Sequence, residues 1–262
     1  MDRRDFVRSG LVAGAAGMTG VRPAAAATDE PRRHYELRNY ELRSDLNPGR
    51  LRNYLRDVAL PAYSRAGANI VGVFTVDTGF ISGSVLALTE YASLGDIDSV
   101  ATKLAGDSAY SDARRTWETA DDVPYVRYQS QLMRAFTGHP RVEVPASLLA
   151  APRMFELRTY EARSEAALEK KIAMFNEVEI TLFRQIGMTP VFFGENIFGT
   201  RLPSLTYMLT FDDMAARTKA WATFSAHPEW LRIQKLPQYQ ANGAVTATNV
   251  AYLRPVNFST LR

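Results

Sequence analysis

Apolar and polar residues alternate along residues 34–43, where the odd-numbered positions are mostly apolar and the even-numbered positions are polar or aromatic. This period of two predicts a strand with one apolar face and one polar–aromatic face. After Asn47-Pro48, apolar residues recur at helical spacing as far as Gly67, and glycine commonly ends helices. Pro61 is expected to kink or end this helix, because proline lacks the amide proton that a helix interior needs.

Two β-rich runs follow at residues 70–77 and 84–91, and the glycines between them are typical of a hairpin turn. A polar helical segment is predicted from residue 93 to about residue 117, and a last strand over residues 125–132. The resulting order, β-α-β-β-α-β, is that of the ferredoxin-like unit. Helices cover one face of its sheet, so the other face must be buried against a second layer.

The chain contains an internal duplication. The segment YELRNYE at residues 35–41 recurs as FELRTYE at residues 155–161, and the same offset of 120 places Gly67 on Gly187. One offset that holds over about 75 residues indicates a repeated structural unit. The helix that follows the second opening strand has no proline, so it is expected to run without a break.

This repeat predicts the domain organisation. The two copies are assigned to residues 34–136 and 153–259, and residues 137–152, which contain three prolines, form a linker. Each copy offers the other a bare sheet face to bury. The predicted fold class is therefore α+β, a tandem duplication of a ferredoxin-like β-α-β-β-α-β unit that forms a pseudo-dimeric α/β barrel.

Residues 1–27 carry the features of an export signal. A basic start with the pair Arg3-Arg4 precedes a short apolar run at residues 11–18 and an alanine-rich cleavage site ending at Ala27. The apolar run is too short to span a bilayer, which needs roughly 20 residues. The paired arginines resemble the twin-arginine signal, so we expect export, cleavage after Ala27 and a periplasmic or extracellular location. The alternative is a cytosolic protein with a basic tail.

Composition excludes several classes of protein. The chain is 46% hydrophobic and 23% charged, as in an average soluble globular protein. It has no cysteine, which excludes disulfides and thiolate metal sites. The net charge of +3 falls to +1 once the four arginines and two aspartates of residues 1–27 are removed. We therefore expect no nucleic-acid partner and no membrane span.

The common motifs of metal, nucleotide and hydrolase sites are absent. The sequence has no H-E-x-x-H, no EF-hand loop, no G-x-G-x-x-G and no G-x-S-x-G, and it has only three histidines. We expect no metal and no cofactor, and the expected partner is a small-molecule ligand. Whether the chain is an enzyme stays open, and no catalytic residue is assigned.

The residues best suited to contact a ligand share the polar–aromatic face of the two opening strands: Glu36, Arg38 and Tyr40 in the first copy, and Glu156, Arg158 and Tyr160 in the second. If the apolar face packs on the helices, this face looks into the barrel. An arginine beside a tyrosine in a partly dry cavity would suit a carboxylate or another anionic oxygen. The alternatives are a structural Glu–Arg pair that fixes the two sheets together, or a catalytic role.

His227 is a further candidate. It precedes Pro228 and Glu229, so it stands where the residue that caps the start of a helix is expected. It could instead serve as a ligand contact, a general base or a metal ligand at the mouth of a pocket. The first copy has Asp107 at the corresponding position, which is a better helix cap.

The opening motifs, YELRNY at residues 35–40 and FELRTY at residues 155–160, resemble the opening of the NIPSNAP family. The segment HPEW at residues 227–230 resembles the second-helix element of that family, whereas the first copy has DSAY at residues 107–110. The resemblance implies the dimeric α/β-barrel fold, which small monooxygenases and haem-processing proteins also have. The resemblance implies no single reaction. Because DSAY in the first copy departs from the family's second-helix element, it is in doubt whether the two halves have equal roles.

Three hypotheses for function follow. The first is a protein that binds a small molecule in the barrel interior. The second is a cofactor-independent, monooxygenase-like or haem-processing enzyme, and the third is a protein-interaction module whose barrel is a solid core. The duplication supplies a pseudo-dimer within one chain, so both a monomer and a homo-oligomer are consistent with the sequence.

Overall fold

The computed structural model describes residues 30–45, 47–144, 153–239 and 244–262. The predicted export signal at residues 1–27 lies outside the described residues. None of the helices within the described ranges is long and apolar enough to cross a membrane.

The first unit has the element order predicted from the sequence. Its strands and helices are β1 (His34–Leu42), α1 (Gly49–Tyr54), the π-helix η1 (Leu55–Ala59), α2 (Leu60–Ala66), β2 (Asn69–Gly79), β3 (Ser84–Tyr91), α3 (Leu94–Gly106), α4 (Ser108–Glu118) and β4 (Tyr125–Ala135).

The second unit repeats this order at the constant offset of 120 residues. Its elements are β5 (Met154–Ala162), α5 (Glu165–Met174), the π-helix η3 (Phe175–Glu179), α6 (Ile180–Gln185), β6 (Thr189–Phe198), β7 (Ser204–Phe211), α7 (Met214–Ala226), α8 (Pro228–Ile233) and β8 (Val245–Pro255). Strands β3 and β7, for example, begin at Ser84 and Ser204. A position in one unit can therefore be compared directly with its counterpart in the other.

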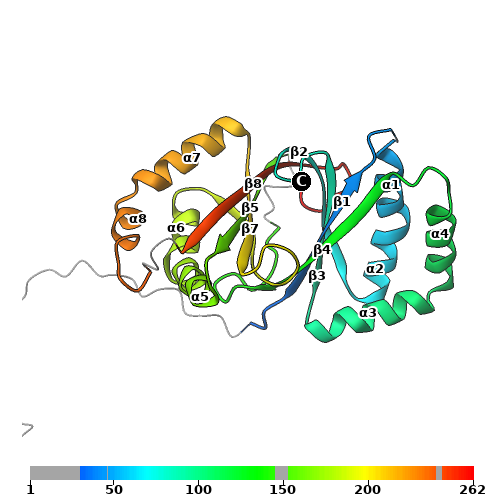
Figure 1. Cartoon of the computed structure of the whole chain (residues 1–262), viewed down its shortest axis with the longest axis horizontal. Coiled ribbons are helices and arrows are strands. Elements are labelled where there is room, and N and C mark those ends of the chain that lie inside the picture. The colour runs from blue at the N-terminus through cyan, green and yellow to red at the C-terminus, as the bar shows by residue number, and fades with distance from the viewer. Residues whose placement is uncertain (1–29, 46, 145–152, 240–243) are drawn as a thin grey trace, which may run out of the picture.

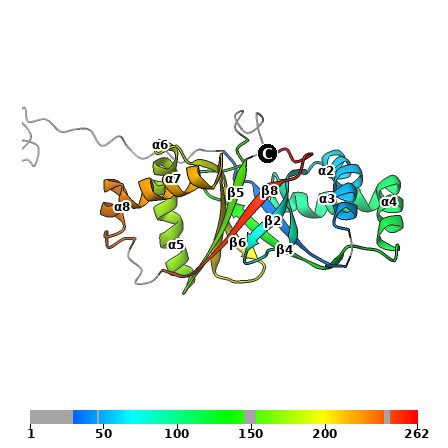
Figure 2. The ribbon, with the colours of Figure 1, turned by 90° about the horizontal axis from the view of Figure 1, so that it is seen from above.

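The eight strands form one closed barrel in the order β1-β3-β2-β8-β5-β7-β6-β4. Antiparallel pairing of β2 with β8 and of β4 with β6 joins the two units. Helices α1–α4 cover the outside of one half of the barrel and α5–α8 the outside of the other, so the molecule is elongated with the strands in the middle (Figure 1; Figure 2). The predicted fold class is confirmed.

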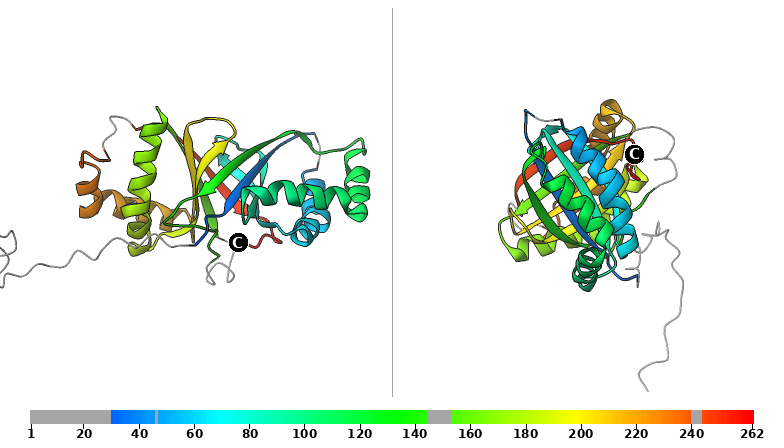
Figure 3. Two further views of the ribbon diagram at one scale, coloured as in Figure 1. Left: turned by 90° about the horizontal axis from the view of Figure 1, so that it is seen from below. Right: turned by 90° about the vertical axis from the view of Figure 1, so that its right-hand side faces the viewer.

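The apolar face of each opening strand points into the barrel, which corrects the expected orientation. Tyr35 and Leu37 belong to one buried cluster with Phe155 and Leu157 of the second unit. The ring centroids of Phe74 and Phe155, which come from different units, lie 5.0 Å apart. The even-numbered positions therefore face the helices and not the barrel interior. The right-hand view of Figure 3 shows the first unit's helices lying across the outer face of its strands.

The first long helix of each unit contains a π-helical turn, η1 or η3. The helix does not end at Pro61, which was one of the two outcomes expected from the sequence, but continues through α2 to Ala66. Pro61 does not cause the π turn, because the second unit has the same turn and carries Thr181 at the corresponding position. The irregularity therefore belongs to the duplicated backbone and not to the proline.

The start of the linker is anchored by a buried histidine, His139. Its Nε2 lies 3.0 Å from the Val191 carbonyl oxygen, and its Nδ1 lies 2.9 Å from Nη2 of Arg184. Because a guanidinium only donates, Nδ1 must accept and the proton must sit on Nε2. Burial lowers the pKa of His139; nearby Glu143 and the Val191 carbonyl act against this shift and Arg184 adds to it. The folded protein thus holds His139 neutral.

This lowered pKa predicts a pH-dependent loss of stability. Below about pH 6.5 His139 is protonated in the unfolded chain but stays neutral in the folded chain. The free energy of unfolding therefore falls as pH drops. The variant His139→Gln should lose less unfolding free energy between about pH 7.5 and pH 5 than the wild type. The limiting difference is about 1.4 kcal/mol per pH unit. Denaturant unfolding at a series of pH values measures it, and parallel curves for the two proteins would contradict the assignment.

Candidate functional site

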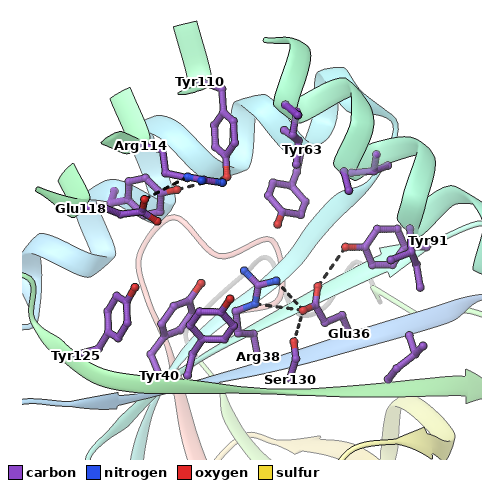
Figure 4. Close-up of a pocket in the computed structure, with 18 of the residues that line it drawn as sticks. Glu36, Arg38, Tyr40, Tyr63, Tyr91, Tyr110, Arg114, Glu118, Tyr125 and Ser130 are labelled. Atoms are coloured by element: carbon purple, nitrogen blue, oxygen red, sulfur yellow. Dashed lines mark hydrogen bonds and ion pairs between the residues drawn. The ribbon is translucent and has the colours of Figure 1, made fainter. Parts of the chain in front are cut away.

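A cavity of about 530 Å³ lies between the sheet and the helices of the first unit. Strands β1, β3 and β4 form its floor, and α1, α2, α3 and α4 form its walls (Figure 4). Its most frequent lining residue is tyrosine, and the seven tyrosines are Tyr40, Tyr54, Tyr63, Tyr91, Tyr110, Tyr125 and Tyr128. We call this space the sheet–helix cavity.

The strand and helix periodicities place these side chains on the surfaces that face the sheet–helix cavity. Glu36, Arg38 and Tyr40 occupy alternate positions of β1, so all three point to the same face. Tyr110 and Arg114 are one turn apart on α4, so both project from the same side of that helix. Figure 4 shows the helix side chains reaching down toward the strand side chains across the cavity.

Arg38 is held in place by Glu36. Nε and Nη2 of Arg38 lie 3.1 Å and 2.7 Å from Oε1 of Glu36. The same carboxylate accepts hydrogen bonds from the Tyr91 hydroxyl, at 3.2 Å, and from the Ser130 hydroxyl (Figure 4). The guanidinium is therefore fixed in direction before any ligand arrives.

The electrostatics of the cavity keep Arg38 charged and Tyr40, Tyr63 and Tyr91 neutral. Burial opposes the charged form of Arg38, but Glu36, Tyr40 and Tyr63 outweigh it, so the pKa of Arg38 is raised. Burial raises the pKa of Tyr40 to about 12, even though Arg38 acts to lower it. Burial likewise raises the pKa of Tyr63 and of Tyr91. At neutral pH the cavity thus offers phenol hydroxyls beside two ion pairs, Arg38 with Glu36 and Arg114 with Glu118.

An aromatic stack closes one side of the cavity. The ring of Trp117 lies between Tyr54, at a centroid distance of 4.3 Å, and Tyr125, at 5.8 Å, with both pairs nearly parallel. The indole Nε1 of Trp117 is buried and has no hydrogen-bond partner in the described part of the chain. Since a buried N–H without a partner is costly, this donor suits an acceptor atom on a ligand.

The second unit uses the same strand residues to build a buried ion cluster. Glu156 is fully buried, and its carboxylate accepts bonds from Nε and Nη2 of Arg217 at 3.0 Å and 2.7 Å. It also accepts from Trp221 Nε1 at 2.8 Å and from Nη1 of Arg158 at 2.8 Å. The guanidinium of Arg158 stacks over the Trp221 ring at 4.4 Å. Here the Glu–Arg pair is structural.

Larger side chains occupy the space that is hollow in the first unit. At the offset of 120, the cavity residues Ala101 and Leu104 correspond to Trp221 and Phe224, and Ala87, which does not line the cavity itself, corresponds to Tyr207. These three aromatic residues belong to one cluster with Phe175 and Phe183. Lys171 and Glu179, which replace Leu51 and Ala59, form an ion pair of 2.5 Å beneath Phe175. The duplicated backbone therefore carries a cavity in one unit and a packed core in the other.

The residues proposed from the sequence thus fall into three groups. Glu36, Arg38 and Tyr40 line the sheet–helix cavity, and Glu156, Arg158 and Tyr160 lie at the equivalent but packed place. His227 caps α8, since its Nδ1 accepts from the Glu229 amide at 3.2 Å, and it lines neither of the two large cavities.

Sequence reasoning missed the tyrosines and Trp117 that the helices contribute. A signal was present in the alignment of the two copies, because alanine in the first copy stands opposite Tyr207 and Trp221 in the second. A small residue opposite a large one at two neighbouring positions indicates unequal filling of equivalent spaces.

Comparison with known proteins finds a family match over the second unit. Residues 155–260 match the NIPSNAP family, which confirms the family resemblance predicted from the opening motifs. A NIPSNAP-like domain protein from Burkholderia xenovorans is 21% identical, covers 41% of this chain and 88% of its own, and has a TM-score of 0.36. No curated protein sequence matches the chain.

Two solved structures share the fold over most of the chain. A candidate monooxygenase from Lactobacillus acidophilus has a TM-score of 0.51 at 12% identity, covering 86% of this chain and 94% of its own. A second, from Fusobacterium nucleatum, has a TM-score of 0.54 at 9% identity, covering 87% and 94%. At such low identity the likeness shows the fold alone.

The two glutamates at equivalent positions should differ in their contribution to stability. Glu156→Gln leaves Arg158 and Arg217 without a counter-charge in a buried site, and breaking such a cluster costs about 3–5 kcal/mol. Glu36→Gln should cost about 1 kcal/mol, because Arg38 is 27% exposed and water can solvate it. Denaturant unfolding of both variants measures the difference. Equal losses would contradict the assignment of a structural role to the second unit alone.

Proposed function

We propose that this chain, a NIPSNAP-family protein by its second half, binds a small aromatic molecule in the sheet–helix cavity of its first half. The observation that carries the proposal is the cavity itself, about 530 Å³ of space lined by seven tyrosines around a fixed arginine. Ligand sites are typically concave, aromatic and supplied with a few oriented polar groups. The equivalent space of the second unit is filled, which argues that the hollow is not a requirement of the fold.

The lining favours a planar ligand that carries acceptor oxygens. Flat aromatic walls such as the Tyr54–Trp117 stack suit a ring system. The neutral tyrosine hydroxyls, the unpaired Trp117 N–H and the Arg38 guanidinium are all hydrogen-bond donors. A carboxylate or another anionic oxygen on an aromatic ring would satisfy several of them at once.

A second candidate function is a cofactor-independent, monooxygenase-like activity on such a ligand. What supports it is the set of hydrogen-bond donors that line the cavity, since preorganised donors stabilise an oxyanion as it forms on a bound substrate. The fold shared with two candidate monooxygenases supports it by analogy only. For haem processing a tyrosine would have to ligate the iron, because none of the chain's three histidines is among the residues that line the cavity.

The third hypothesis, a protein-interaction module, rests on a different feature. Val126 and Phe198 are 59% and 68% exposed, and Phe198 stands at the rim of the sheet–helix cavity. Exposed apolar residues at the rim of a cavity are consistent with ligand entry and also with contact to a protein partner. Because the described hollow lies behind this rim, ligand binding explains more of the observed arrangement.

Binding of 2-naphthoate, a fluorescent aromatic carboxylate, tests the proposal. We expect saturable binding to the wild type, followed by fluorescence. The double variant Glu36→Gln/Arg38→Gln removes the fixed cation without leaving an unpaired charge, and it should weaken binding at least about tenfold, because a charge-assisted bond is lost. Binding that the double variant leaves unchanged would overturn the role given to Arg38.

A matched pair of tryptophan substitutions locates the binding site. Ala101→Trp places in the cavity the side chain that the second unit carries at Trp221, so it should abolish binding while the fold is kept. Thr102→Trp introduces the same side chain at the next position of α3, which does not line the cavity, and should leave binding unchanged. Equal effects of the two variants would place the ligand elsewhere.

We also propose that the protein is exported by the twin-arginine route. The support is the sequence of residues 1–27, with Arg3-Arg4 ahead of a weakly hydrophobic run. The variant Arg3→Lys/Arg4→Lys should retain the precursor in the cytoplasm of a bacterium that has this route. The wild type should appear outside the cytoplasm with a mass that begins at Thr28. Cell fractionation and intact mass measure both outcomes, and export that survives the double substitution would contradict the route.

A further inference from the structure

A second cavity, of about 610 Å³, opens at one end of the barrel. Its inner part is apolar, formed by Leu37, Leu86 and Leu157, and the β2–β3 turn contributes Phe80 to its rim. Several residues of the second unit line it, whereas Phe198 is the one second-unit residue among those that line the sheet–helix cavity. We call this space the barrel mouth. It belongs to a different layer of the molecule from the site proposed above.

The barrel mouth contains a buried amide that lacks a partner. Asn39 lies on β1 at an inward-facing position and is only 9% exposed. Its Oδ1 is buried and has no hydrogen-bond partner among the described residues. An unpaired buried carbonyl destabilises the folded state, because it gives up its hydrogen bond to water on folding. The arrangement is explained if a ligand donates a hydrogen bond to it.

A hydrogen-bond network on the opposite wall leaves one donor free. The Thr206 hydroxyl oxygen accepts from Gln131 Nε2 at 2.9 Å and from Asn196 Nδ2 at 3.1 Å. Because a hydroxyl has two acceptor sites, Thr206 must give its own proton to Thr159 Oγ1, 2.9 Å away. The hydroxyl proton of Thr159, which lines the barrel mouth, is then left to point at a ligand acceptor.

The free acceptor and the free donor come from strands at opposite sides of the barrel, and both residues line its mouth. Strands β1 and β5 lie four strands apart in either direction around the eight-stranded ring. Asn39 and Thr159 occupy equivalent positions of these strands, at the offset of 120. A ligand seated between them would meet an acceptor on one side and a donor on the other, above an apolar floor.

Charges at the rim are compensated within the protein. The carboxylate of Glu41 accepts from Arg127 at 3.1 Å and from Gln129 at 2.9 Å. Arg201 donates to Glu161 at 2.9 Å. An ionic ligand would therefore find no uncompensated counter-charge among the rim residues Glu41 and Arg201, which favours a neutral one.

We propose that the barrel mouth is a second small-molecule site, which takes an uncharged molecule with a carboxamide group on an apolar body. A carboxamide both donates and accepts, so it matches Asn39 and Thr159 together. The apolar body would lie on Leu37, Leu86 and Leu157. Apart from Ser130, which lines both cavities, this site differs from the sheet–helix cavity in place, residues and ligand charge, so either proposal can fail without the other.

Titration of isotope-labelled protein with benzamide, followed by nuclear magnetic resonance, tests the site. Benzamide should shift the side-chain amide signals of Asn39 and Gln131 in a saturable way, with the millimolar affinity expected of a ligand with few atoms. Benzoate, which has the same shape and a charge, should shift these signals much less. In Asn39→Leu the saturable response of Gln131 should disappear, while the thermal midpoint stays the same or rises because the unpaired amide is gone.

Two further variants keep the result interpretable. Asn39→Ala removes the acceptor without adding bulk and should weaken benzamide binding at least about tenfold, so it serves if Asn39→Leu does not fold. Ala101→Trp fills the other cavity and should leave the response at Gln131 unchanged. The proposal is overturned if benzamide gives no saturable shift at the barrel mouth, if both Asn39 variants bind it as the wild type does, or if Ala101→Trp abolishes the response.

Discussion

The burial of one sheet face against the other is the constraint on which the remaining structure depends. Tyr35 and Leu37 of the first unit share a core with Phe155 and Leu157 of the second. Either four-stranded sheet alone would therefore expose its apolar face to water. Once these odd-numbered positions point inward, the even-numbered ones must point to the helices. The Glu–Arg–Tyr triplet of each opening strand is thereby placed outside the barrel, in the layer where a ligand cavity or a helix anchor forms.

The same triplet then has two different uses on one repeated backbone. In the second unit, Arg217 and Trp221 from α7 complete the coordination of a fully buried Glu156, so the strand and helix are locked together. In the first unit the corresponding α3 positions are Ile97 and Ala101, which cannot donate, and space remains above Arg38. Strands β2 and β8 pair and so join the two units. The packed second unit therefore supports the strands that line the cavity of the first unit.

Much of this arrangement could be predicted from the sequence. The offset of 120 and the alternation at residues 34–43 were sufficient for the element order, the duplication and the barrel. The direction of the alternating faces was not predictable, because tyrosine and leucine suit a barrel core and a helix interface equally well. The cavity was missed because Tyr63, Tyr110 and Trp117 come from separate helices, and only tertiary packing brings them over Arg38.

Both cavities hold polar groups that packing alone does not require. A fold that needed only stability could fill the first unit as it fills the second, with aromatic residues at Ala87 and Ala101. It could also carry an apolar residue in place of Asn39, whose carbonyl has no partner among the described residues. Unpaired Trp117 and Asn39 groups lower the stability of the free protein, and each stands on the wall of a cavity. Under the two binding proposals, ligands would supply the missing partners, and the same groups that weaken the empty protein would give it selectivity for those ligands.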